Sequence, residues 1–219
     1  MLTLYDDETS SEGYTVRTLL EILGLEYQSI ALETYRPGDG EVPREPLTVA
    51  VRDSPAGEPG PVVHGTEACL FYLCRRYDSD SRLTGGTDAH RSARIFDWVF
   101  FAHRLADSLA AARRYEAFGD PILFNGQGQD VEAARAQGHR LLELLDRHLW
   151  FAEEGGHDFI VGNLSLADIA CFGDVALAEE GGVDRQDYPA IRRWCDRVKR
   201  VPHYPLMPGI YPTGAPALS

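Results

Sequence analysis

Three consecutive hydroxyl side chains near the start of the chain are the first candidates for chemistry. Thr9, Ser10 and Ser11 follow an apolar segment, residues 2–5, and precede residues 14–23, whose apolar side chains recur at helical spacing. Serine and threonine are preferred caps of helix N-termini, so residue type alone favours a capping role. A hydroxyl at the positive end of a helix dipole can also donate to a sulfur atom and favour its thiolate form.

The cysteines and histidines carry no motif of their own. The four cysteines are Cys69, Cys74, Cys171 and Cys195. They lie among apolar residues without a Cys-x-x-Cys pair, so we expect small buried side chains in a reducing compartment. Residues 6–15 contain no cysteine, which argues against disulfide exchange of the thioredoxin type. The seven histidines are scattered without ligand spacing, so we expect no metal site.

Composition narrows the classes of partner. The 219 residues include 34 acidic and 21 basic side chains, which give a formal net charge of -13 and disfavour nucleic acid as a partner. A hydrophobic fraction of 44% is typical of a folded globular protein. The first residues lack a basic segment followed by an apolar one, and no apolar run is long enough to cross a bilayer. These features predict a cytoplasmic protein without a membrane partner.

The first part of the chain predicts a mixed α/β unit. Two strands at residues 2–5 and 27–32 flank the first helix and would be parallel in a βαβ arrangement. A loop rich in proline and glycine separates them from a third strand, and a long turn leads to a fourth strand and a helix. The expected bounds of these later elements are residues 47–51, 52–60, 61–63 and 66–76. We assign the whole unit, residues 1–78, to one domain.

The second part predicts only helices. A polar segment, residues 79–87, is interpreted as a linker, and residues 88–205 as an all-helical domain followed by an extended tail, residues 206–219. One helical face spans from Ile95 through Leu105 to Ala112. The expected fold class is therefore α/β plus all-α.

A capping box is predicted within the helical part. Ser165 can cap a helix, and Asp168, three residues later, can accept the backbone N–H of Ser165. Leu164 and Ile169 stand at the two positions of a hydrophobic staple. Both signals indicate a helix beginning after Ser165, and they concern the fold rather than catalysis.

Several segments together resemble the glutathione transferase superfamily. They are LTLYDDETSSEGYTVRTLLEILGLEY, FDWVFFAHRLADSLAAARRY, FIVGNLSLADIACFGDVALA and DYPAIRRWCDRVKRVPHYPLM. The resemblance is to bacterial members with a serine in the active-site loop, and it covers nearly the whole chain. It implies a thioredoxin-like N-terminal domain and a C-terminal helical bundle domain.

The resemblance also assigns a thiol-activating residue. Alignment on the Leu-Thr-Leu-Tyr opening and on Val16-Arg17 places Ser10 where serine-type members carry the hydroxyl that meets the glutathione sulfur. Thr9 and Ser11 are the alternatives for that role. Tyr14 is a further hydroxyl nearby, whose position inside the helix favours packing.

The glutathione side of the site follows from the same resemblance. Members pair the peptide backbone with the residue after a cis-proline, for which Pro46 and Leu47 are the best candidates and Val42-Pro43 the competing choice. The γ-glutamyl carboxylate is expected at Gly65, Thr66 and Glu67, where members commonly have Glu-Ser or Gln-Ser. Glycine at position 65 departs from that pattern, and so does the long 52–60 turn.

The resemblance also implies a substrate pocket and a function. Its lining would come from Tyr14, Phe101, His103, Leu105 and Arg113. The implied function is an enzyme, a transferase of alkyl or aryl groups, that directs the thiolate of glutathione, its co-substrate, at a small-molecule electrophile. The alternative is a non-catalytic binding or regulatory protein with a degenerate glutathione site. Members are commonly homodimers, so a homodimer is implied.

Overall fold

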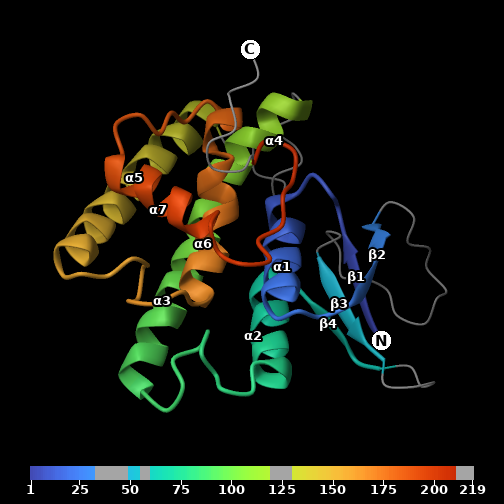
Figure 1. Cartoon of the computed structure of the whole chain (residues 1–219). Coiled ribbons are helices and arrows are strands. Elements are labelled where there is room, and N and C mark those ends of the chain that lie inside the picture. Colours follow the sequence, from blue (N-terminus) through green and yellow to red (C-terminus); the bar gives the residue numbers. More distant parts are fainter. Residues whose placement is uncertain (33–48, 55–59, 119–129, 211–219) are drawn as a thin grey trace.

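The computed structural model describes residues 1–32, 49–54, 60–118 and 130–210, and these form a sheet-containing part beside a helical part. Figure 1 shows the sheet on one side, the helices α1 and α2 in the middle, and the remaining helices on the other side. The first two helices therefore separate the sheet from the helical part. This arrangement is a thioredoxin-like N-terminal domain followed by a helical C-terminal domain, as the sequence predicts.

The sheet has four strands in the order β2-β1-β3-β4. Strand β1 (Leu2–Asp6) is parallel to β2 (Tyr27–Ala31) and antiparallel to β3 (Ala50–Asp53), and β3 is antiparallel to β4 (Val62–His64). It follows that β4 runs in the same direction as β1. The mixed four-stranded sheet is confirmed.

Strand β3 ends later than the sequence predicts, and β4 begins later than the sequence predicts. Strand β3 continues through Arg52 and Asp53, where the sequence indicates a turn. The Asp53 carboxylate accepts hydrogen bonds from the hydroxyls of Tyr72 and Tyr77, each at 2.8 Å, so its charge is accommodated. Pro61 lies outside β4 because proline has no N–H for the ladder, although its carbonyl accepts from Asp53 at 3.1 Å.

Two helices begin at one edge of this sheet. Tyr5, Ala50 and His64 lie in one row across β1, β3 and β4. Because β1 and β4 are parallel and both end at this edge, the helices that follow them start there. These helices are α1 (Ser11–Ile22) and α2 (Thr66–Tyr77). The topology thus brings the two helix N-termini to the same side of the protein.

Helices make up the rest of the described chain. They are α3 (Ala89–Leu105), α4 (Ala111–Phe118), α5 (Val131–Glu154), α6 (Leu166–Ala176) and α7 (Pro189–Val198), with a 3₁₀ segment η4 (Ala178–Gly181) after α6. The described residues between 91 and 200 contain no strand, only an isolated bridge between Phe159 and Gly162. Among the helices in the described ranges, none combines the length and apolar character needed to cross a bilayer.

The long helix predicted around residues 95–112 is interrupted. A π-helical segment, η2 (Ala106–Ala110), joins α3 to α4. The Ser108 hydroxyl shares its hydrogen between the carbonyls of Arg104 at 3.1 Å and Leu105 at 3.2 Å, one turn earlier. An extra residue in a helix rotates everything after it by about 100° relative to the preceding face. Helix α4 therefore presents a different face from the one an uninterrupted helix would present.

The predicted capping box is confirmed at the start of α6. Asp168 Oδ2 accepts the backbone N–H of Ser165 at 3.0 Å and its hydroxyl at 3.1 Å. The other oxygen accepts from Ile160 N and from Trp194 Nε1, both at 2.9 Å. The Asp168 side chain is fully buried, and burial raises its pKa to about 6. One carboxylate thus joins three segments of the helical core.

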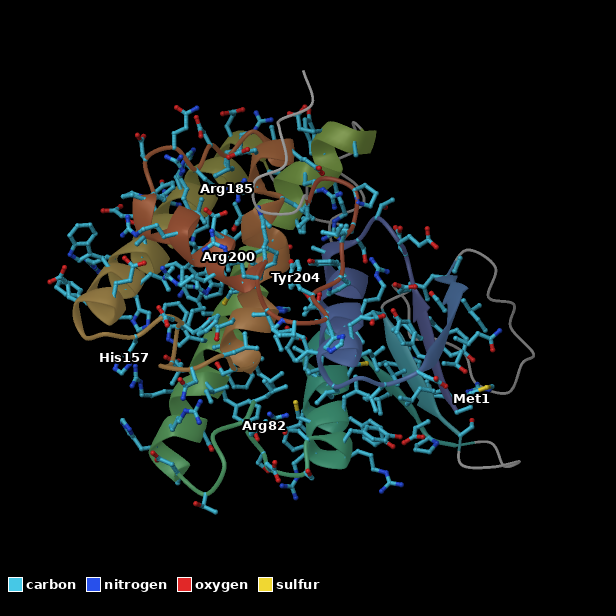
Figure 2. All side chains as sticks on the ribbon, in the orientation of Figure 1. Met1, Arg82, His157, Arg185, Arg200 and Tyr204 are labelled. Carbon is cyan, nitrogen blue, oxygen red and sulfur yellow. The ribbon has the colours of Figure 1, made fainter. Side chains whose placement is uncertain are left out.

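The beginning of the expected C-terminal tail packs on the core. Met207 and Ile210 are both buried. Just before them, the Tyr204 hydroxyl is hydrogen-bonded to that of Tyr14, and Figure 2 places Tyr204 where α1 meets the helical part. Residues 199–210 therefore help to join the two parts.

Candidate functional site

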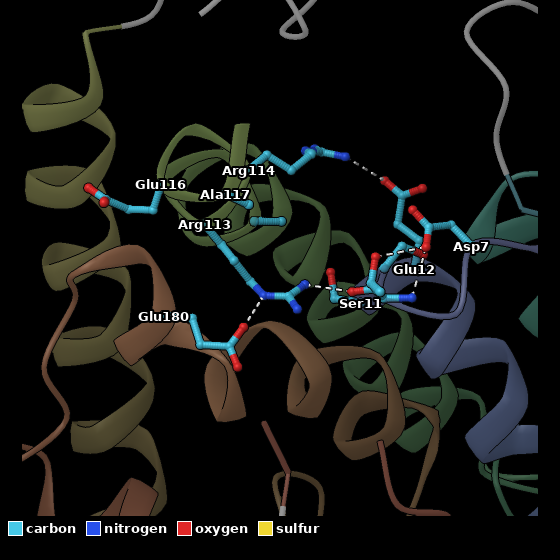
Figure 3. Close-up of a pocket in the computed structure, with 11 residues that line it drawn as sticks. Asp7, Ser11, Glu12, Arg113, Arg114, Glu116, Ala117 and Glu180 are labelled. Carbon is cyan, nitrogen blue, oxygen red and sulfur yellow. Dashed lines mark hydrogen bonds and ion pairs between the residues drawn. The ribbon is translucent and has the colours of Figure 1, made fainter. Parts of the chain in front are cut away.

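A pocket of about 440 Å³ opens between the loop after β1 and helix α4 (Figure 3). Its described lining is Asp7, Thr9, Ser10, Ser11, Glu12, Ala110, Arg113, Arg114, Glu116, Ala117 and Glu180. All three candidate hydroxyls thus border one cavity, and so does Arg113. The pocket lies at the edge where α1 begins, next to the positive end of that helix.

Ser10 is the N-cap of α1. Its Oγ accepts the backbone N–H of Gly13 at 2.9 Å. A hydroxyl has one hydrogen to donate and two lone pairs, so accepting this bond leaves the hydrogen available for another acceptor. The polar first turn, Ser11 to Gly13, belongs to the helix although the apolar pattern begins only at Tyr14. Helix α1 therefore starts earlier than predicted because its first turn carries the cap rather than core residues.

The loop before Ser10 is held by its own side chains and by α1. Asp7 Oδ1 accepts from both the backbone N–H and the hydroxyl of Thr9 at 2.8 Å. The Ser10 N–H donates to the Asp7 carbonyl at 3.0 Å. Arg17 pairs with buried Asp6 and donates to the Glu8 carbonyl at 2.9 Å. These bonds fix the path of the chain into the helix.

Helix α4 closes the other side of the pocket with arginines. Arg113 Nη1 donates to the Thr9 carbonyl at 2.7 Å, and its Nε donates to Glu180 Oε2 at 2.5 Å. Arg114 Nη1 lies 4.0 Å from Glu12 Oε1. Figure 3 shows Arg113 extended between the Ser10 loop and Glu180. Both arginines therefore face protein carboxylates across the pocket.

A buried carboxylate, Asp174 of α6, stands next to these groups. Its pKa is raised to about 6, chiefly because burial penalises the charged form. Hydrogen bonding with Ser11 lowers the pKa, Glu12 raises it, and the positive charges of Arg114 and Arg113 lower it. Its Oδ1 has no hydrogen-bond partner among the described residues. The start of α1 thus lies above a carboxyl group that titrates near neutral pH.

The second predicted group lies at the N-terminus of α2. Gly65 is the N-cap with φ +88°, a conformation that favours glycine, and a Cβ there would meet no atom of the described chain within 4 Å. Among the described residues, no side chain accepts a cap hydrogen bond from the first amides of α2, and Thr66, the first residue of the helix, is half-buried. Adjacent strands are about 4.8 Å apart, so the ends of β1 and β4 are separated by roughly 10 Å. Ser10 therefore caps one helix and Thr66 begins another, and both helices follow strands that end at the same edge of the sheet.

Glu67, in the first turn of α2, faces His103 of α3. Its Oε1 lies 3.2 Å from His103 Nδ1, and the other ring nitrogen lies 3.9 Å from Asp107 Oδ2. His103 is exposed and is held between two carboxylates. The structure thus places His103 beside the glutathione-side candidates rather than in the pocket that contains Ser10.

The remaining predicted pocket residues are distributed elsewhere. Tyr14 is buried and its hydroxyl contacts Tyr204, and Leu105 is fully buried in the core. Phe101 lines a separate groove between α3 and α5. Pro46 and Leu47 lie outside the described residues, as does Val42-Pro43. Of the five residues expected to line the substrate pocket, Arg113 is the one found in the described lining around Ser10.

Sequence reasoning missed the acidic residues around this pocket, among them Asp7, Glu180 and Asp174. Asp7 and Glu180 lie in polar segments whose contacts depend on chain folding. Asp174 had a recognisable signal, because it is a lone carboxylate late in a helix that is otherwise apolar nearly all round. A charge in such a helix calls for a partner from another element. Here α1 and α4 supply the neighbours.

The other ionisable groups of the described residues form neither a metal-binding cluster nor an exposed thiol. Within the described ranges, no three His, Cys, Asp or Glu side chains converge as metal ligands would. All four cysteines are free and buried. Burial raises the pKa of Cys69 and Cys74 to about 12, so these thiols stay protonated at neutral pH.

Comparison with known proteins identifies the family of the C-terminal part of the chain. Residues 96–202 match the sequence profile of the glutathione S-transferase C-terminal domain. Two curated relatives are glutathione S-transferase verG of Clonostachys rogersoniana, 26% identical over 61% of this chain, and glutathione S-transferase aclG of Aspergillus oryzae, 29% identical over 63%. The matched segments span 55% and 60% of the lengths of those relatives, less than two thirds.

Solved structures resemble the chain over nearly its full length. A possible glutathione S-transferase from Rhodopseudomonas palustris has 23% identity and a TM-score of 0.76, covering 94% of this chain and 97% of that one. Ure2p in complex with glutathione has 20% identity and a TM-score of 0.74, covering 93% and 96%. Residues 96–202 therefore belong to the glutathione S-transferase C-terminal domain family, and the chain as a whole has the two-part fold of the glutathione transferase superfamily.

Proposed function

We propose that this protein is an enzyme that directs the thiolate of glutathione at a small electrophile, transferring an alkyl or aryl group to the sulfur. The observation that carries the proposal is the position of Ser10, whose hydroxyl caps α1 and lines a pocket of about 440 Å³. A cavity of this size accommodates a small organic molecule beside the sulfur. The electrophile would lie between Ser10 and α4.

The chemistry needs a thiol that ionises near neutral pH. A free cysteine thiol has a pKa near 8.5, and a hydroxyl donor together with a helix N-terminus lowers it. Ser10 supplies the hydroxyl hydrogen and α1 supplies the dipole. The thiol proton passes to solvent, and the thiolate forms a carbon–sulfur bond. Either a leaving group departs with the electron pair, or the adduct takes a proton from solvent.

The N-terminus of α2 would hold the γ-glutamyl end of glutathione. An anion is stabilised there by uncapped amides and the helix dipole, and the Thr66 hydroxyl adds a donor. Three residues span about 10 Å, which matches the roughly 10 Å between the ends of β1 and β4. Glu67, in the first turn of α2, would receive the γ-glutamyl amine in place of the side chain that Gly65 lacks. Pro46 and Leu47 remain the proposed backbone-pairing residues.

A direct test measures binding and chemistry separately. Retention on immobilised glutathione reports binding, and the ultraviolet absorbance of bound thiolate against pH reports ionisation. Conjugation to a generic aryl halide reports transfer. Binding with a thiol pKa below that of free glutathione, together with transfer, supports the proposal. A parent protein without any of these at millimolar glutathione would refute it.

The second candidate function is a binding or regulatory protein with a degenerate glutathione site. Gly65 and the contact of Glu67 with His103 favour it, because the first removes a side-chain ligand and the second engages another. Such a protein would bind glutathione weakly, without lowering the thiol pKa. The same titration therefore distinguishes the two functions.

We also propose a homodimer and a cytoplasmic location. A groove of about 510 Å³ between α3 and α5 is lined partly by charged side chains and partly by apolar ones that include Phe100 and Phe151, which are 67% and 68% exposed. Large exposed aromatic side chains that flank a groove are typical of protein interfaces. A second copy of this chain is the proposed partner.

The four free, buried cysteines fit a reducing compartment, which supports the proposed cytoplasmic location.

A further inference from the structure

The Arg113 side chain is oriented by two contacts within the protein. Its Nη1 donates to the Thr9 carbonyl at 2.7 Å, and its Nε donates to Glu180 Oε2 at 2.5 Å. The side chain is largely buried, with 18% of its surface exposed. Charge-assisted bonds of this kind are stronger and more directional than neutral ones. The guanidinium therefore joins the loop before Ser10 to the helical part of the protein.

The local structure of the helical part brings this contact into place. The π-helical segment η2 ends just before α4, so it sets the direction in which Arg113 leaves the helix. On the other side, a Cβ at Gly181 would lie 2.8 Å from the backbone nitrogen of Arg113. Glycine at position 181 thus allows η4 to approach the α4 backbone closely. That approach places Glu180, the preceding residue, against the guanidinium.

The carbonyl that Arg113 contacts belongs to the peptide group between Thr9 and Ser10. Fixing this oxygen fixes the orientation of the peptide plane from which the Ser10 side chain projects. The loop side supplies the Asp7 bonds to Thr9, and Arg113 supplies the bond from the helical part. The Ser10 hydroxyl is thereby held from both parts of the protein.

We propose that Arg113 is a positioning residue for the Ser10 hydroxyl, and that it acts through the Thr9 carbonyl rather than by binding the electrophile. This inference rests on the proposed function. Its consequence is that Arg113 controls the ionisation of the glutathione thiol. An anion-binding arginine would instead select anionic electrophiles and leave the thiol pKa unchanged.

The test compares two arginines that are equally exposed and both pair with η4. Arg113→Met removes the contact with Thr9, whereas Arg185→Met removes an ion pair with Glu179 at 3.1 Å. The side chains of Arg113 and Arg185 are each 18% exposed. Figure 2 labels Arg185 on the helical side of the molecule. Glu180→Gln keeps the shape of the Arg113 partner and removes its charge, which provides a milder variant. Each protein is assayed for amide exchange at residues 9–11, for the bound thiol pKa, and for transfer to one neutral and one anionic electrophile.

We expect Arg113→Met to raise the thiol pKa by about one unit, which lowers the thiolate fraction and the rate roughly tenfold at a pH below that pKa. The loss should be equal for both electrophiles, and amide exchange at residues 9–11 should become faster. Glu180→Gln should change the thiol pKa, the transfer rate and the amide exchange in the same direction but by less. Arg185→Met should change none of these three quantities. An unchanged thiol pKa in the Arg113 variant, or a loss confined to the anionic electrophile, overturns the inference. A parent without glutathione chemistry refutes the proposed function instead.

Discussion

The Oγ of Ser10 lies 2.9 Å from the backbone nitrogen of Gly13 and accepts its hydrogen bond. Capping and thiol activation are usually treated as alternative roles for such a hydroxyl, yet they use different parts of it. The cap occupies a lone pair and fixes the direction of the side chain, while the hydrogen can point toward a ligand. The contact therefore prepares Ser10 for the proposed chemistry.

Replacing Ser10 by alanine should reduce the rate of transfer far more than the affinity for glutathione. A hydrogen bond to a charged group contributes about 1.5–3 kcal/mol, so we expect a rate loss on the order of ten- to hundredfold with a raised thiol pKa. Steady-state kinetics and thiolate titration measure both. Ser10→Thr, which keeps the hydroxyl and the cap, is the matched control. Full activity and an unchanged pKa in Ser10→Ala would move the role to Thr9 or Ser11.

Replacing Thr66 by alanine should have the opposite effect. The substitution removes a donor for the γ-glutamyl carboxylate but leaves the sulfur environment intact. A hydrogen bond to a charged group contributes about 1.5–3 kcal/mol, so glutathione affinity should fall on the order of ten- to hundredfold with a nearly unchanged rate at saturation. Calorimetry and saturation kinetics separate the two, and Thr66→Ser should restore affinity. Equal affinity in parent and Thr66→Ala would place the carboxylate elsewhere.

The capping box at α6 should contribute stability without touching the pocket. Ser165→Ala removes a cap at an expected cost of about 1 kcal/mol in the free energy of unfolding. Asp168→Ala should cost more, several kcal/mol, because it leaves Ile160 N and Trp194 Nε1 buried without their acceptor. Denaturant unfolding measures both, with exposed Asp158→Ala as the control. Identical midpoints for Asp168→Ala and the parent would contradict this account.

Asp174 should make stability depend on pH. Its pKa is raised to about 6 by burial, above its ordinary value of 3.8, so the folded protein binds more protons than the unfolded chain between these values. Its contribution to stability is therefore complete below about pH 4 and is lost as pH rises through about 6. The full change is up to about 3 kcal/mol. Asp174→Asn cannot titrate, so the difference in unfolding free energy between variant and parent should shift in favour of the variant from pH 4 to pH 8. A difference that stays constant with pH would show that Asp174 does not titrate in this range.

The groove between α3 and α5 should mediate self-association. Light scattering should give twice the chain mass for the parent, and Phe100→Glu should give a monomer because a buried unpaired charge is costly at an interface. Leu206→Glu places the same charge at another exposed apolar residue, 58% exposed and outside the groove lining, and should remain dimeric. A parent that is monomeric at assay concentrations would refute the homodimer.

The amino-acid sequence by itself determined the helices and caps that have strong local sequence patterns. The helix near Leu19 and Leu20, the all-helical second part and the Ser165–Asp168 box depend on periodicity and on contacts three or four residues apart. The resemblance carried by the loop residues singled out Ser10, and its role as a cap was readable from residue type. Local chemistry is fixed by the sequence because neighbours along the chain are neighbours in space.

Tertiary structure decided which residues meet around Ser10. Arg113 and Thr9 are 104 positions apart, and their contact depends on the π-helical turn before α4 and on the close approach of η4 at Gly181. Neither feature has a periodic signal, because a single extra residue in a helix redirects every later side chain while the apolar pattern changes little. Phe101 and His103 of α3 lie on two different sides of that helix, against α5 and α2, while Arg113 of α4 reaches the loop before Ser10. Spacing along a helix predicts a shared face only while the helix keeps one period.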